Sequence, residues 1–406
     1  MHSPTAEPAP EPADAPAIWL LALSQTLGFA ALLYIFAALL VPWEAALGWP
    51  KSQLALGPTA SILTSAALAP LVGRLIDRGW GGALLVGGAG LGTLALVLLS
   101  QVVTPGQFIA VWVLIGVAHA ACLYEACFAF LIRRLGRAAR PAIIRITLVA
   151  GFASSLAFPA GAYFSEALGW RGAVLCFAAA LGLLAMPANL LATRRLRRQA
   201  RATPRETVTA SDEKAAYRQA LGQRRFWLLA MLFALAATNH TMLVNFFIPV
   251  FLERGASPAM AVLAASCVGP AQVAGRLALM LWEARIGTAR ATLLMLGMQV
   301  LAALVLWSAG AAPWLIFAFA LFQGAAHGLM SILKPVLVAE ALGHAAYGAL
   351  AGSLATGALL GMAAAPFLGA VLIEAGGAAA LILVALGMAL AALVCALLVL
   401  REPAGG

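Results

Sequence analysis

Charge is scarce in this chain. Of its 406 residues, 10% are charged and 63% are hydrophobic, and the mean hydropathy is +0.97. A soluble domain of this length could not bury so much apolar surface, but a lipid bilayer accommodates it in helical spans of about 20 residues. The composition therefore excludes a soluble protein and indicates an integral membrane protein.

Patterns typical of enzymes are missing as well. The sequence contains no phosphate-binding loop, so nothing supports ATP-driven transport. The cysteines lie inside apolar runs without metal-ligand or disulfide spacing and are interpreted as core thiols: Cys122, Cys127, Cys176, Cys267 and Cys395. We therefore expect no enzymatic activity, no cofactor and no metal site.

What the sequence does contain is an internal repeat. A shift of 208 positions superimposes identical residues without gaps, among them Trp19 on Trp227, Pro50 on Pro258, Gly79 on Gly287, Gly116 on Gly324, His119 on His327 and Glu166 on Glu374. One constant offset across helices and loops indicates two copies of one unit. Two parallel copies of six spans form the architecture of transporters whose halves rock about a central site.

Twelve apolar runs are long enough to cross a bilayer, where helices are expected because backbone polar groups need partners within their own segment. The predicted spans are residues 17–42, 51–74, 81–103, 106–132, 141–166, 170–193, 225–252, 257–283, 289–310, 313–342, 346–373 and 376–400. The predicted fold class is all-α integral membrane, with twelve transmembrane helices in two pseudosymmetric six-helix bundles.

Five segments follow from this pattern. They are a disordered cytoplasmic tail at 1–16, an N-terminal half at 17–193, a cytoplasmic linker at 194–224, a C-terminal half at 225–400 and a cytoplasmic tail at 401–406. The first tail is rich in Pro, Ala and acidic residues and lacks the basic segment with which a signal peptide begins.

Basic residues gather on one side of the predicted bundle. The loops on that side carry Arg74, Arg78, Arg133, Arg134, Arg137, Arg140, Arg285 and Arg290 besides the basic linker, whereas the other side has Lys51, Arg171 and Arg254. By the positive-inside rule, the basic side and both termini are cytoplasmic. The net charge of +10 is therefore a topology signal and not a nucleic-acid footprint. The expected location is a bacterial inner membrane.

The stretch Gly73-Arg74-Leu75-Ile76-Asp77-Arg78-Gly79, between the second and third spans, resembles the signature loop of the major facilitator superfamily. The chain looks like a member of that family over its whole length. In the family this loop acts as a cytoplasmic latch, so the resemblance implies that role for Gly73, Asp77 and Arg78. The further basic residues usual in the loop are replaced here by Trp80-Gly81-Gly82.

Two features separate the chain from the proton-coupled drug exporters of that family. Trp112 stands where they carry an Arg in span 4, and Phe158-Pro159-Ala160-Gly161 replaces their Gly-Pro pair in span 5. The stretch Gly269-Pro270-Ala271-Gln272-Val273-Ala274-Gly275-Arg276 is instead similar to span 8 of the monocarboxylate-porter branch, in which an Arg pairs with the substrate carboxylate. Gln272 stands where that branch often has an Asp.

Arg276 is the first candidate for a substrate contact. A guanidinium deep in a span is costly unless it faces water or a partner, and it can bind a carboxylate by two parallel hydrogen bonds. Gln272 precedes it by four residues and shares its helical face. The alternative is that span 8 ends earlier and that Arg276 is an anchor at the membrane surface.

Span 10 carries a polar stripe of His327, Ser331 and Lys334, at spacings of four and three. Lys334 is interpreted as a second anion contact or as a cation that snorkels to the cytoplasmic surface. His119, the repeat mate of His327, is expected to face it across the cavity. Both histidines are candidate proton carriers, and the alternative is that they only pack.

Glu125 in span 4 is expected to form a structural ion pair with Arg145 in span 5, with proton carriage as the alternative. Tyr124 beside it is interpreted as a substrate contact or a packing residue. Span 7 carries a second polar stripe: Thr238, Thr241 and Asn245. We take Thr241 and Asn245 as candidate substrate contacts, and polar helix packing is the alternative.

The predicted function is secondary active transport by alternating access, in which a small organic anion of the monocarboxylate class moves with a proton. The alternative is proton-coupled efflux of a small or amphipathic compound. A third hypothesis is a membrane sensor that binds a ligand without transport. The expected partners are the substrate, the proton and the lipid bilayer, without nucleic acid, and we expect a monomer.

Overall fold

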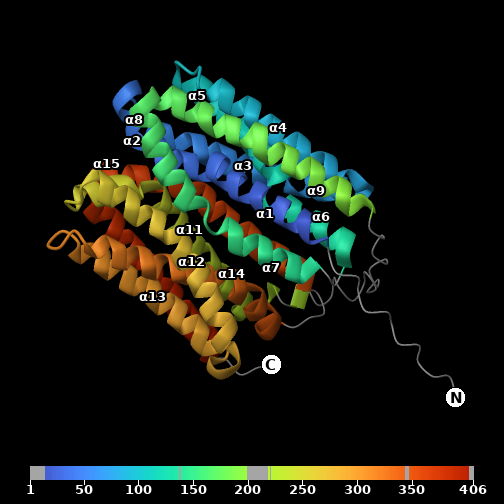
Figure 1. Cartoon of the computed structure of the whole chain (residues 1–406). Helices are drawn as coiled ribbons and strands as arrows, with labels where there is room; N and C mark the ends of the chain where they lie inside the picture. Colours follow the sequence, from blue (N-terminus) through green and yellow to red (C-terminus); the bar gives the residue numbers. More distant parts are fainter. Residues whose placement is uncertain (1–13, 137–138, 199–217, 220, 343–346, 402–406) are drawn as a thin grey trace.

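A computed structural model describes residues 14–136, 139–198, 218–219, 221–342 and 347–401, which form helices and turns (Figure 1). Most of the predicted tail 1–16 lies outside the described residues, as do most of the linker 194–224 and of the tail 401–406. Arg137 also lies outside them.

The first half of the chain forms one bundle and the second half another, coloured blue to green and yellow to red in Figure 1. The helices of the first bundle are α1 (Ala15–Phe29), α2 (Ile35–Leu47), α3 (Lys51–Leu75), α4 (Gly81–Leu99), α5 (Pro105–Cys122), α6 (Tyr124–Leu135), α7 (Ala139–Ala150), α8 (Ala153–Ala180) and α9 (Met186–Arg198). Three π-helical turns join some of them: Ala30–Tyr34, Ile76–Trp80 and Leu181–Ala185. The second bundle consists of α11 (Arg224–Glu253), α12 (Pro258–Ile286), α13 (Thr288–Ser308), α14 (Leu315–Leu342) and α15 (Tyr347–Arg401).

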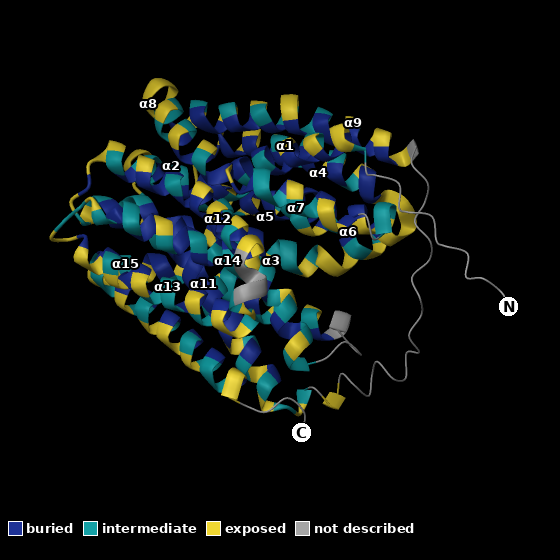
Figure 2. Ribbon diagram, turned by 60° about the horizontal axis from the view of Figure 1, so that its bottom comes forward, coloured by how far each residue is buried: buried dark blue, intermediate teal, exposed yellow. Residues whose placement is uncertain are grey.

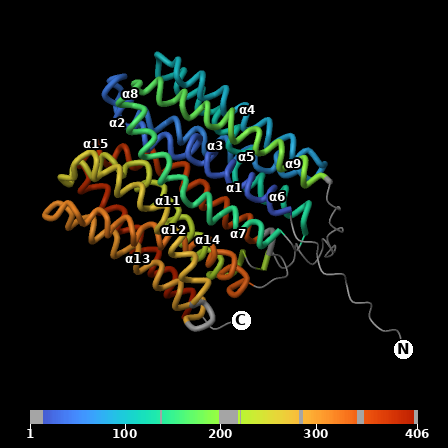
Figure 3. Tube along the Cα trace, in the orientation of Figure 1, coloured from blue at the N-terminus to red at the C-terminus, as the bar shows by residue number. Residues whose placement is uncertain are grey.

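The number of membrane spans follows from where the chain turns. Within the described residues, nine helical stretches are long and apolar enough to cross a membrane. Three of these contain a glycine with positive φ that breaks the helix: Gly79 (97°), Gly169 (70°) and Gly377 (64°). Glycine adopts this backbone conformation without steric cost. Each of the three stretches is therefore two spans joined by a tight turn, so the nine stretches correspond to the twelve predicted spans (Figure 3).

The sequence repeat is also present in the backbone. Gly79 and its repeat mate Gly287 both have positive φ, and so do Gly169 and its mate Gly377. The turns that separate successive spans therefore recur at the same offset as the sequence. This agreement supports the division of the fold into two copies of one unit.

Exposed tryptophans mark the two ends of the apolar belt. Trp19, Trp80 and Trp227 lie at the end that carries most of the arginines, here called the basic end, and Trp307 and Trp314 lie at the opposite end. Tryptophan favours the boundary between lipid and water. Figure 2 shows buried residues facing the inside of the bundles and exposed ones on their surfaces, as expected for helices that face lipid.

Candidate functional site

Arg276 lies inside the protein, between the two halves. It is 6% exposed, and it donates hydrogen bonds from Nε to Ser331 Oγ (3.1 Å) and from Nη1 to the Thr147 carbonyl oxygen (2.6 Å). Ser331 belongs to α14 of the second half, whereas Thr147 belongs to α7 of the first half. Of the two positions considered from the sequence, the structure has Arg276 in the interior and not at the membrane surface.

Small residues allow α12 to approach the first half this closely. A Cβ atom on Gly269 would lie 2.6 Å from the Gly151 carbonyl oxygen, and the Ser155 hydroxyl donates a hydrogen bond of 2.7 Å to the Ser266 carbonyl oxygen. Three contacts thus follow one another along antiparallel helices: Ser155–Ser266, Gly151–Gly269 and Thr147–Arg276. The two halves share a tight seam, and the Arg276 guanidinium lies along it.

A second donor lies beside this guanidinium. Gln272, one helical turn before Arg276, is 4% exposed, and its Nε2 group has no hydrogen-bond partner among the described residues. Its polar neighbour is the Tyr34 hydroxyl, which also interacts electrostatically with Arg276. Tyr34 ends the π-helical turn in span 1, and such turns are frequent at functional sites. Two buried donors of α12 therefore meet a tyrosine of the first half.

Span 4 is interrupted between α5 and α6. Leu123, between α5 and α6, has extended backbone angles (φ −88°, ψ −165°). Gln25 Nε2 donates a hydrogen bond of 2.8 Å to the Cys122 carbonyl oxygen next to the break. Since α6 begins after this break, Glu125 lies in its first turn, where the helix dipole favours a carboxylate. The interruption thus provides a place for an acidic residue within a membrane span.

Tyr124 packs against other aromatic rings and also has a polar neighbour. Its ring lies between those of Phe29 and Phe128, with centroid separations of 4.3 Å and 4.7 Å. Its hydroxyl interacts electrostatically with Arg276. Tyr124 therefore packs in an aromatic row and also belongs to the polar groups around Arg276. We call Tyr34, Tyr124, Gln272, Arg276 and Ser331 the central cluster.

The expected ion pair between Glu125 and Arg145 is wrong. Among the described residues, the ion pairs within 4 Å are Lys51–Glu44, Arg133–Asp77 and Arg195–Asp14. The charge of Glu125 acts instead on His119 of its own half and on Lys334 of the other half, without a hydrogen bond or ion pair to either among the described residues. The expectation assumed an unbroken helix through span 4, and the break at Leu123 changes the direction of every side chain after it.

The two repeat-related histidines have different neighbours. His327 stacks on His240 of α11, with ring centroids 3.4 Å apart and an interplanar angle of 8°. His119 interacts with Glu125. The ring of His327 is packed within its own half, and the expectation that His119 and His327 face each other across the cavity stays a prediction. His240 is not part of the polar stripe of Thr238, Thr241 and Asn245 in span 7, yet it is the ring partner of His327.

The polar stripe of span 10 contacts neighbouring helices, although Ser331 is also exposed. His327 meets His240, Ser331 accepts from Arg276, and the Lys334 Nζ atom lies 5.4 Å from the centroid of the Phe233 ring. A cation over an aromatic face is stabilised by the ring quadrupole. Lys334 is therefore directed at a neighbouring helix of its own half, and its charge also acts on Glu125 in the other half.

The polar residues of span 7 bond mostly within the second half. Thr238 donates to the Ala234 carbonyl oxygen (2.7 Å), and Asn245 Nδ2 donates to the Thr241 carbonyl oxygen (2.7 Å). Asn239 Nδ2 donates to the Ala385 carbonyl oxygen of α15 at 2.7 Å. These bonds satisfy buried polar groups of the second half. A substrate contact by Thr241 or Asn245 remains a prediction.

The predicted latch loop pairs with the end of span 4. Arg133 Nη1 lies 3.9 Å from Asp77 Oδ1, and both side chains are exposed. A Cβ atom on Gly73 would meet no atom within 4 Å, so packing does not require glycine there. Arg78 is exposed at the same end. In this structure the loop is therefore linked to its own half.

The described part of the chain contains no group of three or more His, Cys, Asp or Glu side chains that could hold a metal ion. All five cysteines are unpaired, and Cys122 and Cys127 are buried in span 4.

Sequence reasoning missed three members of the site. Thr147 contributes a backbone oxygen, for which side-chain patterns carry no signal. Tyr34 is a polar aromatic residue in the otherwise apolar middle of the predicted span 17–42, and this is a signal in the sequence that points to it. His240 was overlooked because its packing on His327 depends on how two helices are rotated against each other.

Comparisons with known proteins agree with this architecture. A family profile described as Major Facilitator Superfamily matches residues 18–312. Among solved structures, the chain is similar to a point mutant of the nucleoside transporter NupG, with a TM-score of 0.74 and 14% identity, covering 95% of this chain and 98% of that chain. A second structure of the nucleoside transporter NupG has a TM-score of 0.68 and 15% identity, covering 95% of this chain and 100% of that chain.

A bacterial homologue of the human lysosomal transporter Spinster, in an inward-facing conformation, has a TM-score of 0.66 and 15% identity, with coverage of 97% of this chain and 96% of that chain. Among proteins with curated descriptions, none matches significantly. At these identities, the likeness to solved structures concerns the fold alone.

Proposed function

This chain belongs to the Major Facilitator Superfamily, and it is therefore a membrane transporter and not an enzyme. We propose that it carries a small organic anion of the monocarboxylate class together with a proton. It works as a secondary active transporter by alternating access, with its two halves rocking about the central cluster.

The observation that supports an anion is the buried guanidinium of Arg276. It lies between the halves, and no carboxylate of the described residues is within ion-pair distance of it. Burial of a cation without a counter-charge costs roughly several kcal/mol of folding free energy, and a bound anionic substrate would offset this cost. Gln272 Nε2 is buried, its polar neighbour is the Tyr34 hydroxyl, and it forms no hydrogen bond within 3.5 Å in the described part of the chain, so it supplies a second donor for a carboxylate. Thr241, Asn245 and Lys334 are proposed as outlying contacts.

The proposed proton carriers are Glu125, His119 and His327. Glu125 interacts with His119 and also with Lys334 across the halves. A proton on Glu125 would remove its attraction for Lys334 and thereby weaken an electrostatic contact between the halves. Movement of one anion with one proton is electroneutral, which suits a cluster with one dominant cation.

Membrane orientation is part of the proposal. The basic end faces the cytoplasm of a bacterial inner membrane, both termini are cytoplasmic, and the loop of Gly73, Asp77 and Arg78 acts as a latch on that side. The protein works as a monomer in which residues 194–224 link the halves.

The test is counterflow of radiolabelled lactate, pyruvate, glycolate, oxalate and uridine in proteoliposomes. Wild type should exchange at least one anion, and Arg276→Gln should reduce exchange by about 100-fold, since truncating one partner of a buried charged contact is costly. Arg145→Gln, which removes an equal charge from an exposed site in a neighbouring span, should leave exchange close to wild type. Wild-type exchange of no anion, or equal loss in both variants, would contradict the proposal.

A second candidate is proton-coupled efflux of a small amphipathic compound. The row of Phe29, Tyr124 and Phe128 beside Arg276 favours it, because aromatic faces suit a flat apolar or aromatic cargo. Uridine in the panel covers a nucleoside, the cargo named for a structural neighbour. Uridine exchange that survives Arg276→Gln would favour this candidate over the anion.

A further inference from the structure

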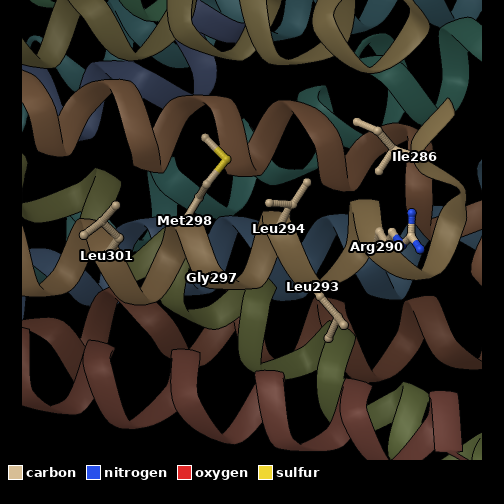
Figure 4. Close-up of a pocket in the computed structure, with 7 residues that line it drawn as sticks. All are labelled: Ile286, Arg290, Leu293, Leu294, Gly297, Met298 and Leu301. Atoms are coloured by element: carbon tan, nitrogen blue, oxygen red, sulfur yellow. The ribbon is translucent and has the colours of Figure 1, made fainter. Parts of the chain in front are cut away.

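A groove of about 700 Å³ runs along one face of α13 (Figure 4). Its wall between Leu293 and Leu301 is apolar and includes the exposed side chains of Leu294 and Leu301. A Cβ atom on Gly297 would meet no atom within 4 Å, so this glycine adds depth to the middle of the groove. The opposite face of α13 is buried in the second bundle, with Met295 and Leu296 fully covered.

Arg290 is the charged residue among those that line this groove, and it lies in the first turn of α13, at the basic end. It is exposed, and no carboxylate of the described residues is within ion-pair distance of it. A cation in the first turn opposes the helix dipole, whereas an anion bound there would be stabilised by the guanidinium and by the dipole. The groove therefore complements a molecule with an anionic head and a long apolar tail.

The first half covers the corresponding place with its own chain. The repeat mate of Arg290 is Gly82 of α4, and a Cβ atom on Gly82 would lie 3.2 Å from Thr193 Cβ and 3.3 Å from Arg197 Nη2, both on α9. The position that matches Thr193 is Arg401, where α15 ends, and the match of Arg197 lies outside the described residues. An arginine from another helix thus overlies the start of α4, whereas α13 carries its own arginine beside an apolar groove.

We propose that this groove binds one anionic phospholipid of the leaflet at the basic end, with the phosphate at Arg290 and one acyl chain along α13. Arg290 and Leu301 are eleven residue steps apart, which corresponds to a rise of about 16 Å along the helix. This length is close to the depth of one leaflet, about half of a hydrocarbon core that is roughly 30 Å thick. A basic residue at this level attracts anionic headgroups. The site is independent of the proposed substrate.

The test is native mass spectrometry of the full-length protein with phosphatidylglycerol and phosphatidylcholine of identical chains. Wild type should retain one phosphatidylglycerol in preference to phosphatidylcholine. Arg290→Gln should weaken this binding by about tenfold through loss of a charge-assisted hydrogen bond. Gly297→Leu, which places a side chain in the groove from a position with open space around its Cβ atom, should weaken it to a similar extent.

Two matched variants serve as controls. Arg140→Gln removes an exposed arginine at the same end, and Gly387→Leu enlarges an exposed glycine of α15 that also has open space around it. Both should bind phosphatidylglycerol as wild type does. Equal retention of the two lipids, an equal loss in Arg140→Gln, or unchanged binding in Gly297→Leu would overturn the proposal. Assembly into a dimer that Gly297→Leu abolishes would also overturn it, since a second copy would then occupy the groove.

Discussion

The two halves share one scaffold but differ in the polar groups that they carry. Gly116 of α5 packs against the Ser61 carbonyl oxygen of α3, and its repeat mate Gly324 of α14 packs in the same way against the Val268 carbonyl oxygen of α12. The helix break at Leu123 has no counterpart at its mate Ser331, because α14 continues through that position. Close helix packing is therefore repeated, whereas the irregular backbone of span 4 occurs once.

Charges differ between the copies in the same way. Glu125 has Leu333 as its mate, and Arg276 has Leu68. The acid of the site thus comes from the first half and its guanidinium from the second. A transporter that rocks its halves apart can use such an arrangement, because every attraction between the charges also acts between the halves. Substitutions at the repeated packing positions should therefore have the same effect in both halves. Substitutions of charged residues should have an effect in one half, and none at the matching position of the other.

The largest effect that separates the halves is expected at Glu125. Glu125→Gln should abolish proton-driven accumulation, whereas exchange without a gradient should persist, because the amide keeps the shape but cannot carry the proton. With a gradient of one pH unit, one-proton co-transport sustains about tenfold accumulation. The variant should therefore fall from that ratio to about one. The assay is uptake into proteoliposomes under an imposed pH gradient.

The control for this variant is its repeat mate, Leu333→Met, which should accumulate substrate as wild type does. If proton-driven accumulation persists in Glu125→Gln, the proton carrier is not Glu125, and His119 and His327 become the candidates. Substitution of each histidine by Gln in the same assay would then identify the carrier.

The scaffold glycines should give the next largest effect. Gly116→Ala and Gly324→Ala each place a Cβ atom against a backbone oxygen of the neighbouring helix, which requires the helices to move apart. Overpacking of this kind costs about 1–3 kcal/mol. Both variants should lower the Tm in detergent by similar amounts, and Gly387→Ala, with open space around it, should not. A lower Tm in only one of these two variants would show that the two halves are not equivalent in their helix packing.

Much of the fold could be predicted from the sequence, because span length, turn glycines and the repeat are local properties of the chain. The breaks and rotations within spans could not. A break at Leu123 leaves no pattern in an apolar run, and it redirects Glu125 from Arg145 toward His119. Composition and periodicity report which residues share a helical face only while the helix is continuous.

Within the site, the sequence was most informative for the second half. Arg276 and Gln272 share one helix and one face, so their spacing predicted a common site, and both are buried as expected. Their partners from the first half were not predicted, because contacts between the halves depend on the seam along α12 and on a backbone oxygen of Thr147. Contacts between two bundles leave no periodic signal in the sequence of either one.

The smallest effect is expected where the halves differ at the start of their first spans. Asp14 caps α1, accepting hydrogen bonds from the Ala17 backbone N–H (3.3 Å) and from Arg195 Nε (2.9 Å). The corresponding cap of α11, Gln223, makes no such side-chain hydrogen bond. Asp14→Ala should therefore cost about 1 kcal/mol, most of it from the cap, since an exposed ion pair contributes little. Thermal unfolding in detergent measures the difference.

The effect of Asp14 should depend on pH. The hydrogen bond from Arg195 lowers the pKa of the Asp14 carboxyl. Because the pKa is lower in the folded state, the stabilisation is present above the unfolded value of about 3.9 and is lost as the pH falls through the folded value. The Tm difference between wild type and Asp14→Ala should thus shrink in acid. Asp14→Asn keeps the cap without the charge, so it should lose less stability than Asp14→Ala at neutral pH. Equal losses in both variants would mean that the charge, and not the cap, distinguishes the start of α1 from that of α11.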